Sequence, residues 1–330
     1  MDKFTPPFSI TNIMLDYVSN IMEKIGKLDN FNSLNKMPIL RKNNRINSIH
    51  SSLAIEANSL SLNQVKDIIN DKVILGPKKE IQEVKNAYNA YNLISITDPF
   101  SIKELKKVHS IMTFLTVDES GEFRRGNEGV FDGENCIFVA PKPEMINELI
   151  NNLFIFMKNS KEKIHPLILS SIFHYEFVFI HPFSDGNGRM ARLWQTIILS
   201  KWKNIFEYIP IESMIKKYQI EYYSAINNCN NAGNSNEFIE FMLNMINKVL
   251  DEVINNSSKE LNHISVYVNK LLDVMDYNIP LTAKEIMDKL DIKSKETLRD
   301  NYINPAIEVG LIKLTLPDKP TSKNQMYYKV

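Results

Sequence analysis

The chain contains little glycine and almost no cysteine: 10 glycines and 2 cysteines among 330 residues. Cys136 and Cys229 lie far apart in the sequence, and neither belongs to a CxxC pair. This spacing argues against a zinc site and against a disulfide framework. The formal net charge is zero, so no overall field attracts nucleic acid or an acidic membrane. Any charged partner must be held by a local patch.

Long hydrophobic runs are also missing. The most apolar stretch, residues 171–183, contains His174 and Glu176. It is shorter than the roughly 20 residues that a membrane-spanning helix needs. Near the start of the chain, Pro6 and Pro7 and the charges that follow do not form a signal peptide. We therefore predict a cytoplasmic protein that does not enter a membrane.

Apolar residues recur at helical spacing along most of the chain, which predicts a mainly α-helical protein. Ser101 precedes one such stripe and is expected to cap a helix. Further helices are expected to begin at Pro143 and near Pro166, because proline suits the first turn of a helix. The helix from Pro166 should end near His181, since Pro182 disfavours helical geometry in the residue before it.

Two regions depart from the helical pattern. Residues 121–143 contain four glycines and an Asp132-Gly133 turn signal between short β-prone runs, which predicts a β-hairpin or an irregular surface loop. In residues 281–330, two short helices, the second starting at Ser294, and a further helix that contains Pro305 and Ala306 precede two strand-like runs, the order of a small winged helix-turn-helix. We expect an N-terminal helical region (1–98), a catalytic core (99–250), a linker (251–262) and a winged-helix-like domain (263–330).

Residues 181–192 read HPFSDGNGRMAR and combine groups that handle phosphate. Gly186, Asn187 and Gly188 lie where a loop becomes a helix, and the unpaired backbone N–H groups there can cradle an anion. An ordinary turn is the alternative for this tripeptide alone. Arg189 and Arg192 are three residues apart, so both guanidinium groups can point along one helix face toward phosphate oxygens.

The same stretch contains a possible base and a possible cation ligand. His181 is the only group in it that can accept and return a proton near neutral pH, as transfer of a phosphoryl or nucleotidyl group to a hydroxyl requires. Asp185 would repel bound phosphates unless a cation bridges them, and Mg²⁺ is the natural choice; a helix cap is the alternative. His174, on an apolar helix, is better explained as a core histidine than as a metal ligand.

The stretch resembles the signature of the Fic family, HPFx(D/E)GN(G/K)RxxR, at every specified position, and the resemblance extends over residues 51–243. It implies a Fic-type helical bundle with a hairpin flap. Fic enzymes commonly transfer AMP from ATP to a Ser, Thr or Tyr hydroxyl of a protein and release pyrophosphate. ATP as substrate and Mg²⁺ as cation are therefore implied. Relatives with Lys at the position of Gly188 can act as kinases, so glycine favours adenylylation.

The resemblance also assigns roles to individual residues. His181 would deprotonate the target hydroxyl, Asp185 would hold Mg²⁺, Arg189 and Arg192 would grip the β and γ phosphates, and Phe183 would anchor the loop in the core. Further contacts to nucleotide or target are expected in the loop, in the flap and in a later segment: Ser184, Gly186, Asn187 and Gly188; Asn135, Cys136, Ile137 and Phe138; Tyr222, Tyr223 and Asn230.

Residues 51–60, SSLAIEANSL, are similar to the inhibitory helix of the family, (S/T)xxxE(G/N). Ser52 and Glu56 have the required spacing, whereas Ala57 stands where Gly or Asn is usual. We predict that Glu56 pairs with Arg192, removes the clamp for the γ-phosphate and leaves ATP in a non-productive pose. The alternative is a surface glutamate on an amphipathic helix.

Two other functions remain open at this point. The same pocket could remove AMP from a modified hydroxyl, with Glu56 orienting a water. The C-terminal region could bind DNA, although nine Lys or Arg against seven Asp or Glu in residues 281–330 are a weak basic surplus. The expected partners are a target protein, the chain itself through self-modification, and a second copy in a possible homodimer.

Overall fold

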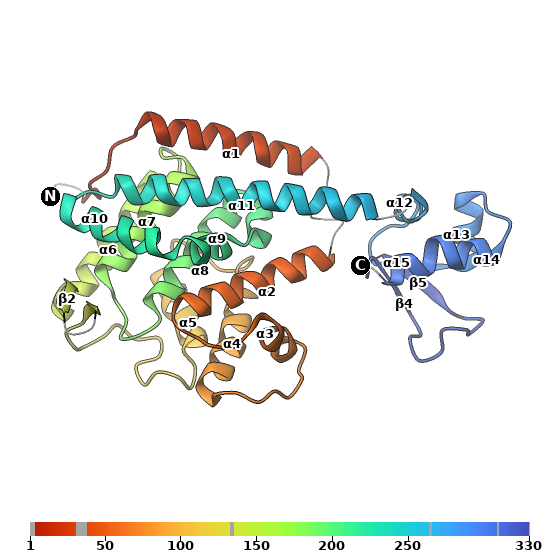
Figure 1. Cartoon of the computed structure of the whole chain (residues 1–330), viewed down its shortest axis with the longest axis horizontal. Helices are drawn as coiled ribbons and strands as arrows, with labels where there is room; N and C mark the ends of the chain where they lie inside the picture. The colour runs from red at the N-terminus through yellow and green to blue at the C-terminus, as the bar shows by residue number, and fades with distance from the viewer. Residues whose placement is uncertain (1–3, 31–37, 133–134, 264–265, 309, 330) are drawn as a thin grey trace. The chain divides into compact units, whose positions relative to one another are not determined.

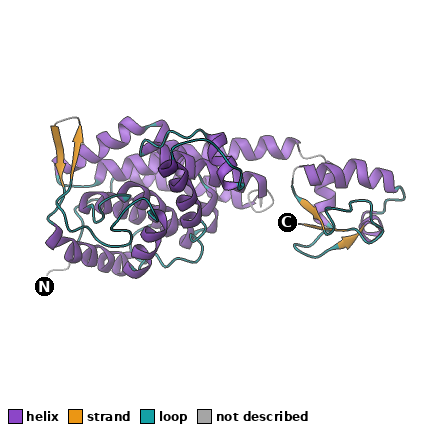
Figure 2. Ribbon diagram, turned by 90° about the horizontal axis from the view of Figure 1, so that it is seen from below, coloured by secondary structure: helices purple, strands orange, loops and turns teal. Residues whose placement is uncertain are grey.

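The computed structural model describes residues 4–30, 38–132, 135–263, 266–308 and 310–329. Most of these residues are helical, as the apolar spacing predicts, and the strands form two small sheets (Figure 1; Figure 2). The chain divides into two compact units, residues 1–24 with 44–250 and residues 25–43 with 251–330. Over the described ranges, none of the helices has both the length and the apolarity needed to cross a bilayer.

The first unit is a helical bundle with one hairpin. Its helices are α1 (Asn12–Asn30), α2 (Pro38–Ile55), α3 (Leu62–Ile69), α4 (Lys78–Tyr91), α5 (Ile102–Met112), α6 (Pro143–Ser160), α7 (Pro166–Ile180), α8 (Asn187–Trp202), α9 (Ile211–Lys217), α10 (Gln219–Ala232) and α11 (Asn236–His263), with a 3-10 turn, η1 (Asn204–Tyr208), before α9. The helices α1, α2 and α11 each continue into the second unit.

Helices α7 and α8 form the core of this bundle. Almost all of their residues are buried. Because α7 is apolar on nearly every side, it is stable only when other helices surround it. Aromatic rings fill the space between the helices: the ring centroid of Phe173 lies 5.8 Å from that of Phe154 and 6.3 Å from that of Trp194. The loop that joins α7 to α8 is therefore fixed at both ends by a packed core.

The N-terminal helix α1 lies alongside α11 (Figure 1). The Thr11 hydroxyl donates a hydrogen bond to Oε1 of Glu240 at 2.6 Å, and Nζ of Lys24 donates to Oδ1 of Asn247 at 2.8 Å. Polar contacts thus join the first residues of the chain to the last helix of the bundle. Residues 1–24 and 44–98 share one compact unit with residues 99–250.

Several predicted helix ends are confirmed. The Ser101 hydroxyl caps α5 and accepts a hydrogen bond from N of Glu104 at 3.3 Å. Pro143 and Pro166 occupy the first turns of α6 and α7, where the missing N–H costs no helical hydrogen bond. The helix α7 ends at Ile180.

The predicted hairpin is also confirmed. Strands β1 (Gly129–Asp132) and β2 (Asn135–Val139) pair antiparallel, with an irregularity in register after Val130. The predicted turn falls partly on residues 133–134, which lie outside the described residues.

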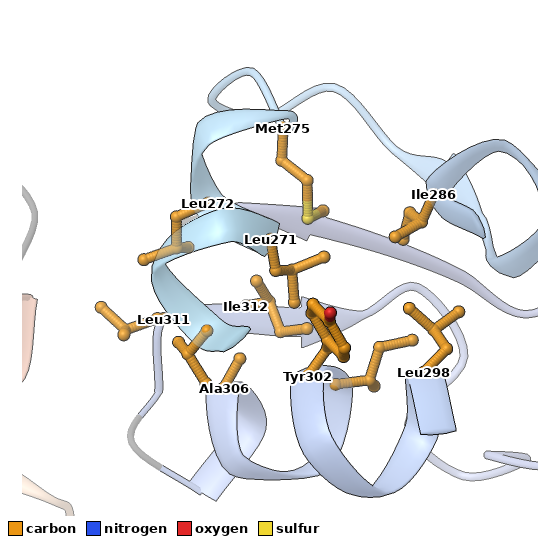
Figure 3. Close-up of a cluster of buried hydrophobic side chains, with 11 residues drawn as sticks. Leu271, Leu272, Met275, Ile286, Leu298, Tyr302, Ala306, Leu311 and Ile312 are labelled. Atoms are coloured by element: carbon orange, nitrogen blue, oxygen red, sulfur yellow. The ribbon is translucent and has the colours of Figure 1, made fainter. Parts of the chain in front are cut away.

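The C-terminal part of the second unit has its own small core (Figure 3). Its elements are α12 (Val266–Asp273), β3 (Leu281–Thr282), α13 (Ala283–Leu290), α14 (Lys295–Thr297), the π-helical segment η2 (Leu298–Ile303), α15 (Asn304–Glu308), β4 (Ile312–Leu314) and β5 (Met326–Lys329). The sheet order is β3-β5-β4, and both pairings are antiparallel. Leu271, Ile286, Leu298 and Ile312 contribute to the core. The order of helices followed by a hairpin agrees with the predicted order.

The segment predicted as a linker, residues 251–262, has helical backbone, because α11 continues to His263. Asn and Ser cost only about 0.5 kcal/mol each relative to Ala in a helix interior. Burial of Val253, which is 2% exposed, supports the helix at the start of this segment. A cluster of Asn and Ser is therefore too weak a signal to end a helix.

Candidate active site

The loop between α7 and α8, residues 181–186, has a left-handed backbone at both ends. The φ angle is 51° at His181 and 84° at Gly186. This conformation costs a residue other than glycine about 1–2 kcal/mol, and strain of this kind is common at functional sites. At Gly186, a Cβ atom would also lie 3.1 Å from Cγ2 of Thr113. The path of the loop thus depends on these two residues.

The Asn187 side chain holds the loop in shape. Its Oδ1 accepts a hydrogen bond from N of Phe183 at 2.9 Å, and its Nδ2 donates to O of Phe183 at 2.7 Å. Asn187 is 3% exposed, so its amide group serves the loop rather than solvent. Of the groups predicted to bind phosphate at this residue, the structure leaves the backbone N–H as the better candidate.

His109 on α5 packs against the same loop. Sequence reasoning missed this residue. Its ring stacks on Phe183 with a centroid distance of 3.6 Å and an interplanar angle of 6°. Nε2 lies 3.0 Å from O of Asp185, and Nδ1 accepts a hydrogen bond from N of Gly121 at 2.9 Å. Burial lowers the pKa of His109 to about 4, so the ring is neutral and can make both bonds. Phe183 is fully buried and anchors the loop, as predicted.

Arg124 joins the loop to the base of the hairpin and was also missed. Its Nε donates to O of His181 at 2.7 Å, Nη1 to O of Gly126 at 2.7 Å, and Nη2 to O of Pro141 at 2.6 Å. The backbone N of Arg124 donates to O of Pro182 at 2.9 Å. One buried guanidinium therefore fixes the signature loop and both ends of the flap relative to one another.

Asp185 and Arg189 form an ion pair one helical turn apart. Nη2 of Arg189 lies 2.8 Å from Oδ1 of Asp185, which also accepts a hydrogen bond from N of Gly186. Burial opposes ionisation of Asp185, but the charge and hydrogen bond of Arg189 outweigh it and hold the pKa below its ordinary 3.8. Asp185 is thus ionised at neutral pH, and its side chain is 42% exposed.

An ion pair joins Glu56 to Arg192, as the sequence predicts. Nη2 of Arg192 lies 2.7 Å from Oε1 of Glu56. Ser52 adds two acceptors: its hydroxyl lies 3.1 Å from Nε and its carbonyl oxygen 2.9 Å from Nη2. The side chain of Arg192 is 1% exposed and that of Glu56 37%. The guanidinium is therefore held by the end of α2 and is not directed at solvent.

Glu56 also lies against the first turn of α8. A Cβ atom at Gly188 would overlap Oε1 of Glu56 and lie 3.1 Å from Nη1 of Arg192. The first turn of a helix carries unpaired N–H groups and a partial positive charge. The carboxylate of Glu56 thus lies where the sequence predicts that an anion binds.

The end of α2 that presents Glu56 is a Schellman cap centred on Ala57. N of Asn58 donates to O of Leu53 at 3.1 Å, and N of Ala57 donates to O of Ala54 at 3.3 Å. Ala57 has a φ angle of 64°, which explains why Gly or Asn is usual at this position in the family motif. Alanine accepts this conformation at a cost of about 1–2 kcal/mol. The cap keeps its form but is under strain.

His181 itself is suited to act as a base. Burial is the main reason that the pKa of its imidazole lies below the usual 6.5, and the charge of Arg124 acts in the same direction. The ring is therefore neutral at pH 7, the state that a general base requires. Nearby, Oγ of Ser184 and Nε of Arg189 are buried without a hydrogen-bond partner among the described residues. Native proteins rarely leave such atoms unpaired, which fits a polar ligand in this loop.

The residues present also fit one Mg²⁺ ion bound mainly through a substrate. The described ranges contain no group of three or more His, Cys, Asp or Glu placed to hold a metal. Mg²⁺ commonly keeps several waters and is bound by one or two carboxylates together with substrate phosphates. Asp185 can supply the carboxylate, because it is ionised, partly exposed and next to the backbone N–H groups at the start of α8.

Of the three residues predicted to contact the nucleoside from α10, one is exposed. Tyr222 is 2% exposed and its hydroxyl lies 2.9 Å from Nε2 of His174, so most of its side chain packs in the core, and its contact with the nucleoside remains a prediction. His174 is a core histidine, as predicted. Tyr223 is 47% exposed and remains available for contact. Oδ1 of Asn230 accepts a hydrogen bond from the Tyr175 hydroxyl at 2.9 Å.

The side chains of four predicted flap residues, Asn135, Cys136, Ile137 and Phe138, lie outside what the structure describes, so their roles remain predictions. Their backbone forms β2, which pairs with β1 in a two-stranded sheet. An extended segment of another protein can add to the edge of such a sheet.

The bundle, the hairpin and the loop define a Fic-type domain. The model of the Fic/DOC family matches residues 99–199, and the model described as "Filamentation induced by cAMP protein Fic-like, C-terminal domain" matches residues 267–328. A crystal structure of a Fic family protein from Desulfovibrio desulfuricans G20 superposes with a TM-score of 0.75 and 37% identity, covering 99% of this chain and 98% of that chain. This chain belongs to the Fic family.

Curated relatives are more distant. The protein adenylyltransferase Fic of Aedes aegypti is 28% identical over 282 residues, which are 81% of this chain and 51% of that protein. The protein of the same name from Culex quinquefasciatus is 29% identical over 216 residues, 62% of this chain and 41% of that protein. The chain spans about half the length, or less, of these curated relatives.

We expect Gly188→Ala to destabilise the wild-type protein but not the Glu56→Gly protein. In the wild type, the added methyl group overlaps Glu56 and breaks its pair with Arg192, at a cost of about 1–2 kcal/mol. Without Glu56, the nearest neighbour of the added methyl group is the end of the Arg192 side chain, 3.1 Å away, which can shift, so the substitution should change stability little. Urea unfolding of the four proteins measures both effects. Equal destabilisation in both backgrounds would contradict the position of Glu56.

Proposed function

We propose that this chain is a protein adenylyltransferase that transfers AMP from ATP to a protein hydroxyl, and that Glu56 holds it inactive. The relatives that carry the name protein adenylyltransferase support this activity. The main support for the proposal is the position of Glu56. Its carboxylate lies against Gly188 in the first turn of α8 and pairs with Arg192. Glu56 and a phosphate group would compete for the same donors.

In the proposed reaction, His181 accepts the proton of the target hydroxyl while the hydroxyl oxygen attacks the α-phosphorus of ATP. The bond from this phosphorus to the oxygen that bridges to the β-phosphate breaks, and pyrophosphate leaves with the electron pair. The neutral imidazole of His181 suits this step, because only the unprotonated ring can take the proton.

The remaining groups of the loop would bind and orient the triphosphate. The backbone N–H groups of Asn187 and Gly188 and the guanidinium groups of Arg189 and Arg192 offer donors to phosphate oxygens, and the N–H of Gly186, now bonded to Asp185, would join them if Asp185 turned toward the cation. Mg²⁺, held by Asp185 and the phosphates, would neutralise the charge that develops on pyrophosphate. While Glu56 occupies Arg192, the γ-phosphate lacks this clamp and the α-phosphorus is not placed in line for attack.

Further predictions and two alternatives belong to this proposal. We infer self-modification alongside modification of a separate target protein in the cytoplasm, and a possible homodimer. Removal of AMP in the same pocket is the alternative reaction, because the carboxylate of Glu56, 37% exposed, could orient a water. DNA binding by the C-terminal unit is the alternative function that involves no catalysis.

Labelled ATP distinguishes nucleotidyl transfer from phosphoryl transfer. We expect the Glu56→Gly protein, incubated with Mg²⁺, to retain label from α-labelled ATP and none from γ-labelled ATP. The reason is that the bond to the β-phosphate breaks and the α-phosphate stays on the protein. Gel autoradiography after denaturation measures the retained label. Label from γ-labelled ATP alone would show a kinase and would contradict the proposal.

A further inference from the structure

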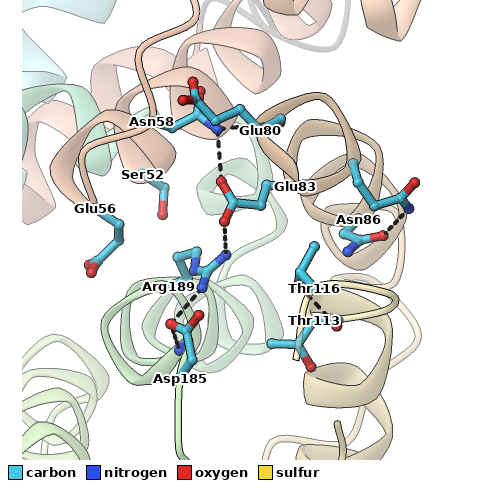
Figure 4. Close-up of polar contacts among 12 residues, drawn as sticks. Ser52, Glu56, Asn58, Glu80, Glu83, Asn86, Thr113, Thr116, Asp185 and Arg189 are labelled. Carbon is cyan, nitrogen blue, oxygen red and sulfur yellow. Dashed lines mark hydrogen bonds and ion pairs between the residues drawn. The ribbon is translucent and has the colours of Figure 1, made fainter. Parts of the chain in front are cut away.

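Arg189 has a second partner, which lies outside the signature loop. Figure 4 shows its guanidinium between Asp185 and Glu83, a residue of α4. Nη1 lies 3.6 Å from Oε1 of Glu83, and Nη2 lies 2.8 Å from Oδ1 of Asp185. The side chains of Arg189 and Glu83 are only 4% and 13% exposed, so salt screens their attraction little. Without this arginine, Glu83 would be a nearly buried charge.

The other carboxylate oxygen of Glu83 holds the end of α2. Nδ2 of Asn58 donates to Oε2 of Glu83 at 2.9 Å, and Oδ1 of Asn58 accepts a hydrogen bond from N of Leu60 at 3.2 Å. Asn58 closes the Schellman cap that presents Glu56. The carboxylate of Glu83 is thus shared between a predicted phosphate clamp and a residue two positions from Glu56 (Figure 4).

We propose that Glu83 is a positioning residue that couples Arg189 to the cap of α2, so that phosphate on Arg189 loosens the hold on Glu56. The proposal rests on the proposed function in assigning phosphate to Arg189. A phosphate that takes the guanidinium deprives Glu83 of its cation, and a carboxylate that is only 13% exposed is costly without one. Glu83 then turns toward solvent, and the Asn58 side chain keeps only its weaker hydrogen bonds to O of Glu80 at 3.3 Å and from N of Leu60 at 3.2 Å. Because such coupling is reciprocal, a docked cap keeps Glu83 on Arg189 and opposes phosphate there.

This link is separate from the ion pair between Glu56 and Arg192. Each arginine of α8 faces a carboxylate from outside the loop, one at the end of α2 and one tied to that end through Asn58. Binding of a triphosphate would therefore act on the inhibitory segment at two places. The strain at Ala57 makes the cap easier to open.

Hydrogen exchange of the backbone amides of residues 56–58 measures the cap directly, because these amides donate to the carbonyl oxygens of Leu53 and Ala54. In nucleotide-free protein, Glu83→Gln and Arg189→Gln should each raise exchange by up to about fivefold, the effect of losing an ion pair that contributes up to about 1 kcal/mol. The double variant should show no more than either single change. Arg189→Gln is the decisive variant, since it removes the cation of Glu83 and leaves Glu83 and Asn58 in place.

Two controls accompany this measurement. Glu104→Gln removes a carboxylate of α5 that pairs with Lys107 at 3.4 Å, and it should leave exchange at residues 56–58 unchanged. The amides of α7 should stay protected in every variant, which shows that the bundle is folded. Wild-type exchange at residues 56–58 in Arg189→Gln, with α7 protected, would overturn the proposal.

Addition of ATP and Mg²⁺ tests the phosphate step. Exchange at residues 56–58 should rise in the wild type and should rise less in Arg189→Gln, where phosphate can act on the segment only through Arg192. An equal rise in both proteins would also overturn the proposal. No rise in the wild type would overturn the coupling of phosphate to the cap. Failure of the proposed function has a different signature: the Glu56→Gly protein would transfer no AMP, whereas the exchange results of the nucleotide-free variants would be unaffected.

Discussion

Replacing Glu56 with glycine should raise the rate of AMP transfer from ATP to protein by about 10- to 100-fold, the range expected when a charge-assisted contact of about 1.5–3 kcal/mol stops competing with substrate. The change removes the carboxylate from Nη2 of Arg192, which keeps its hydrogen bond to O of Ser52, and uncovers the first turn of α8. Both groups then become available to phosphate. Initial rates of label incorporation from α-labelled ATP measure the increase.

A neighbouring carboxylate supplies the control for this prediction. Glu80 binds the same segment, since its Oε2 accepts hydrogen bonds from N and Oγ of Ser59, both at 2.7 Å. It has no contact with Arg192 among the interactions described. Glu80→Gln should therefore raise transfer far less than Glu56→Gly. An equal rise in the two variants would show that general loosening of the segment, and not the carboxylate of Glu56, sets the rate.

Replacing His181 with asparagine in the Glu56→Gly protein should lower AMP transfer by about 100- to 10,000-fold, the usual contribution of a positioned base. Asparagine tolerates the left-handed backbone at this position better than most residues, so the loop should keep its path. The carbonyl oxygen that Arg124 holds is part of the backbone and remains. Single-turnover rates with saturating ATP measure the loss.

The affinity for ATP separates loss of the base from loss of the fold. His181→Asn should bind ATP nearly as well as the parent protein, because the predicted phosphate donors lie in residues 186–192. Calorimetric titration with ATP and a thermal melt provide this control. A variant that binds ATP, melts normally and still transfers AMP at the parent rate would contradict the role of His181.

Local chemistry made much of the fold predictable. The Ser101 cap and Pro166 set helix starts through interactions within one turn, and Asp132-Gly133 placed the hairpin. The linker was predicted from its Asn and Ser residues alone, but α11 continues through residues 251–262. These residues are weak helix formers, and they do not by themselves end a helix. The strand β3, two residues long, exists only through its pairing with β5 and carries no sequence signal of its own.

The part of the candidate site that lies in short sequence motifs was also predictable. The loop from His181 to Arg192 and its partner Glu56 follow from a short motif and a second motif at a fixed spacing. His109, Arg124 and Glu83 could not be found in this way, since each reaches the loop from 57 or more residues away or through another side chain. Only folding brings them together. These residues hold the loop and Arg189 in position and do not themselves donate hydrogen bonds to phosphate.

The position of Ala57 shows what the structure adds to a motif. The sequence marks it only as a departure from Gly or Asn. The φ angle of 64° gives the reason for that preference, because the cap needs a left-handed residue. The chain therefore keeps the inhibitory contact and accepts a strained support for it.

The central claim is that Glu56 restrains an AMP transfer that His181 catalyses. Intact mass of three purified proteins after incubation with ATP and Mg²⁺ tests it most directly: the wild type, Glu56→Gly, and Glu56→Gly with His181→Asn. We predict a gain of one or more adenylyl groups on most of the Glu56→Gly protein, a much smaller modified fraction of the wild type, and none on the double variant. An unmodified Glu56→Gly protein that is folded, or one that gains a phosphoryl group instead, would contradict the claim.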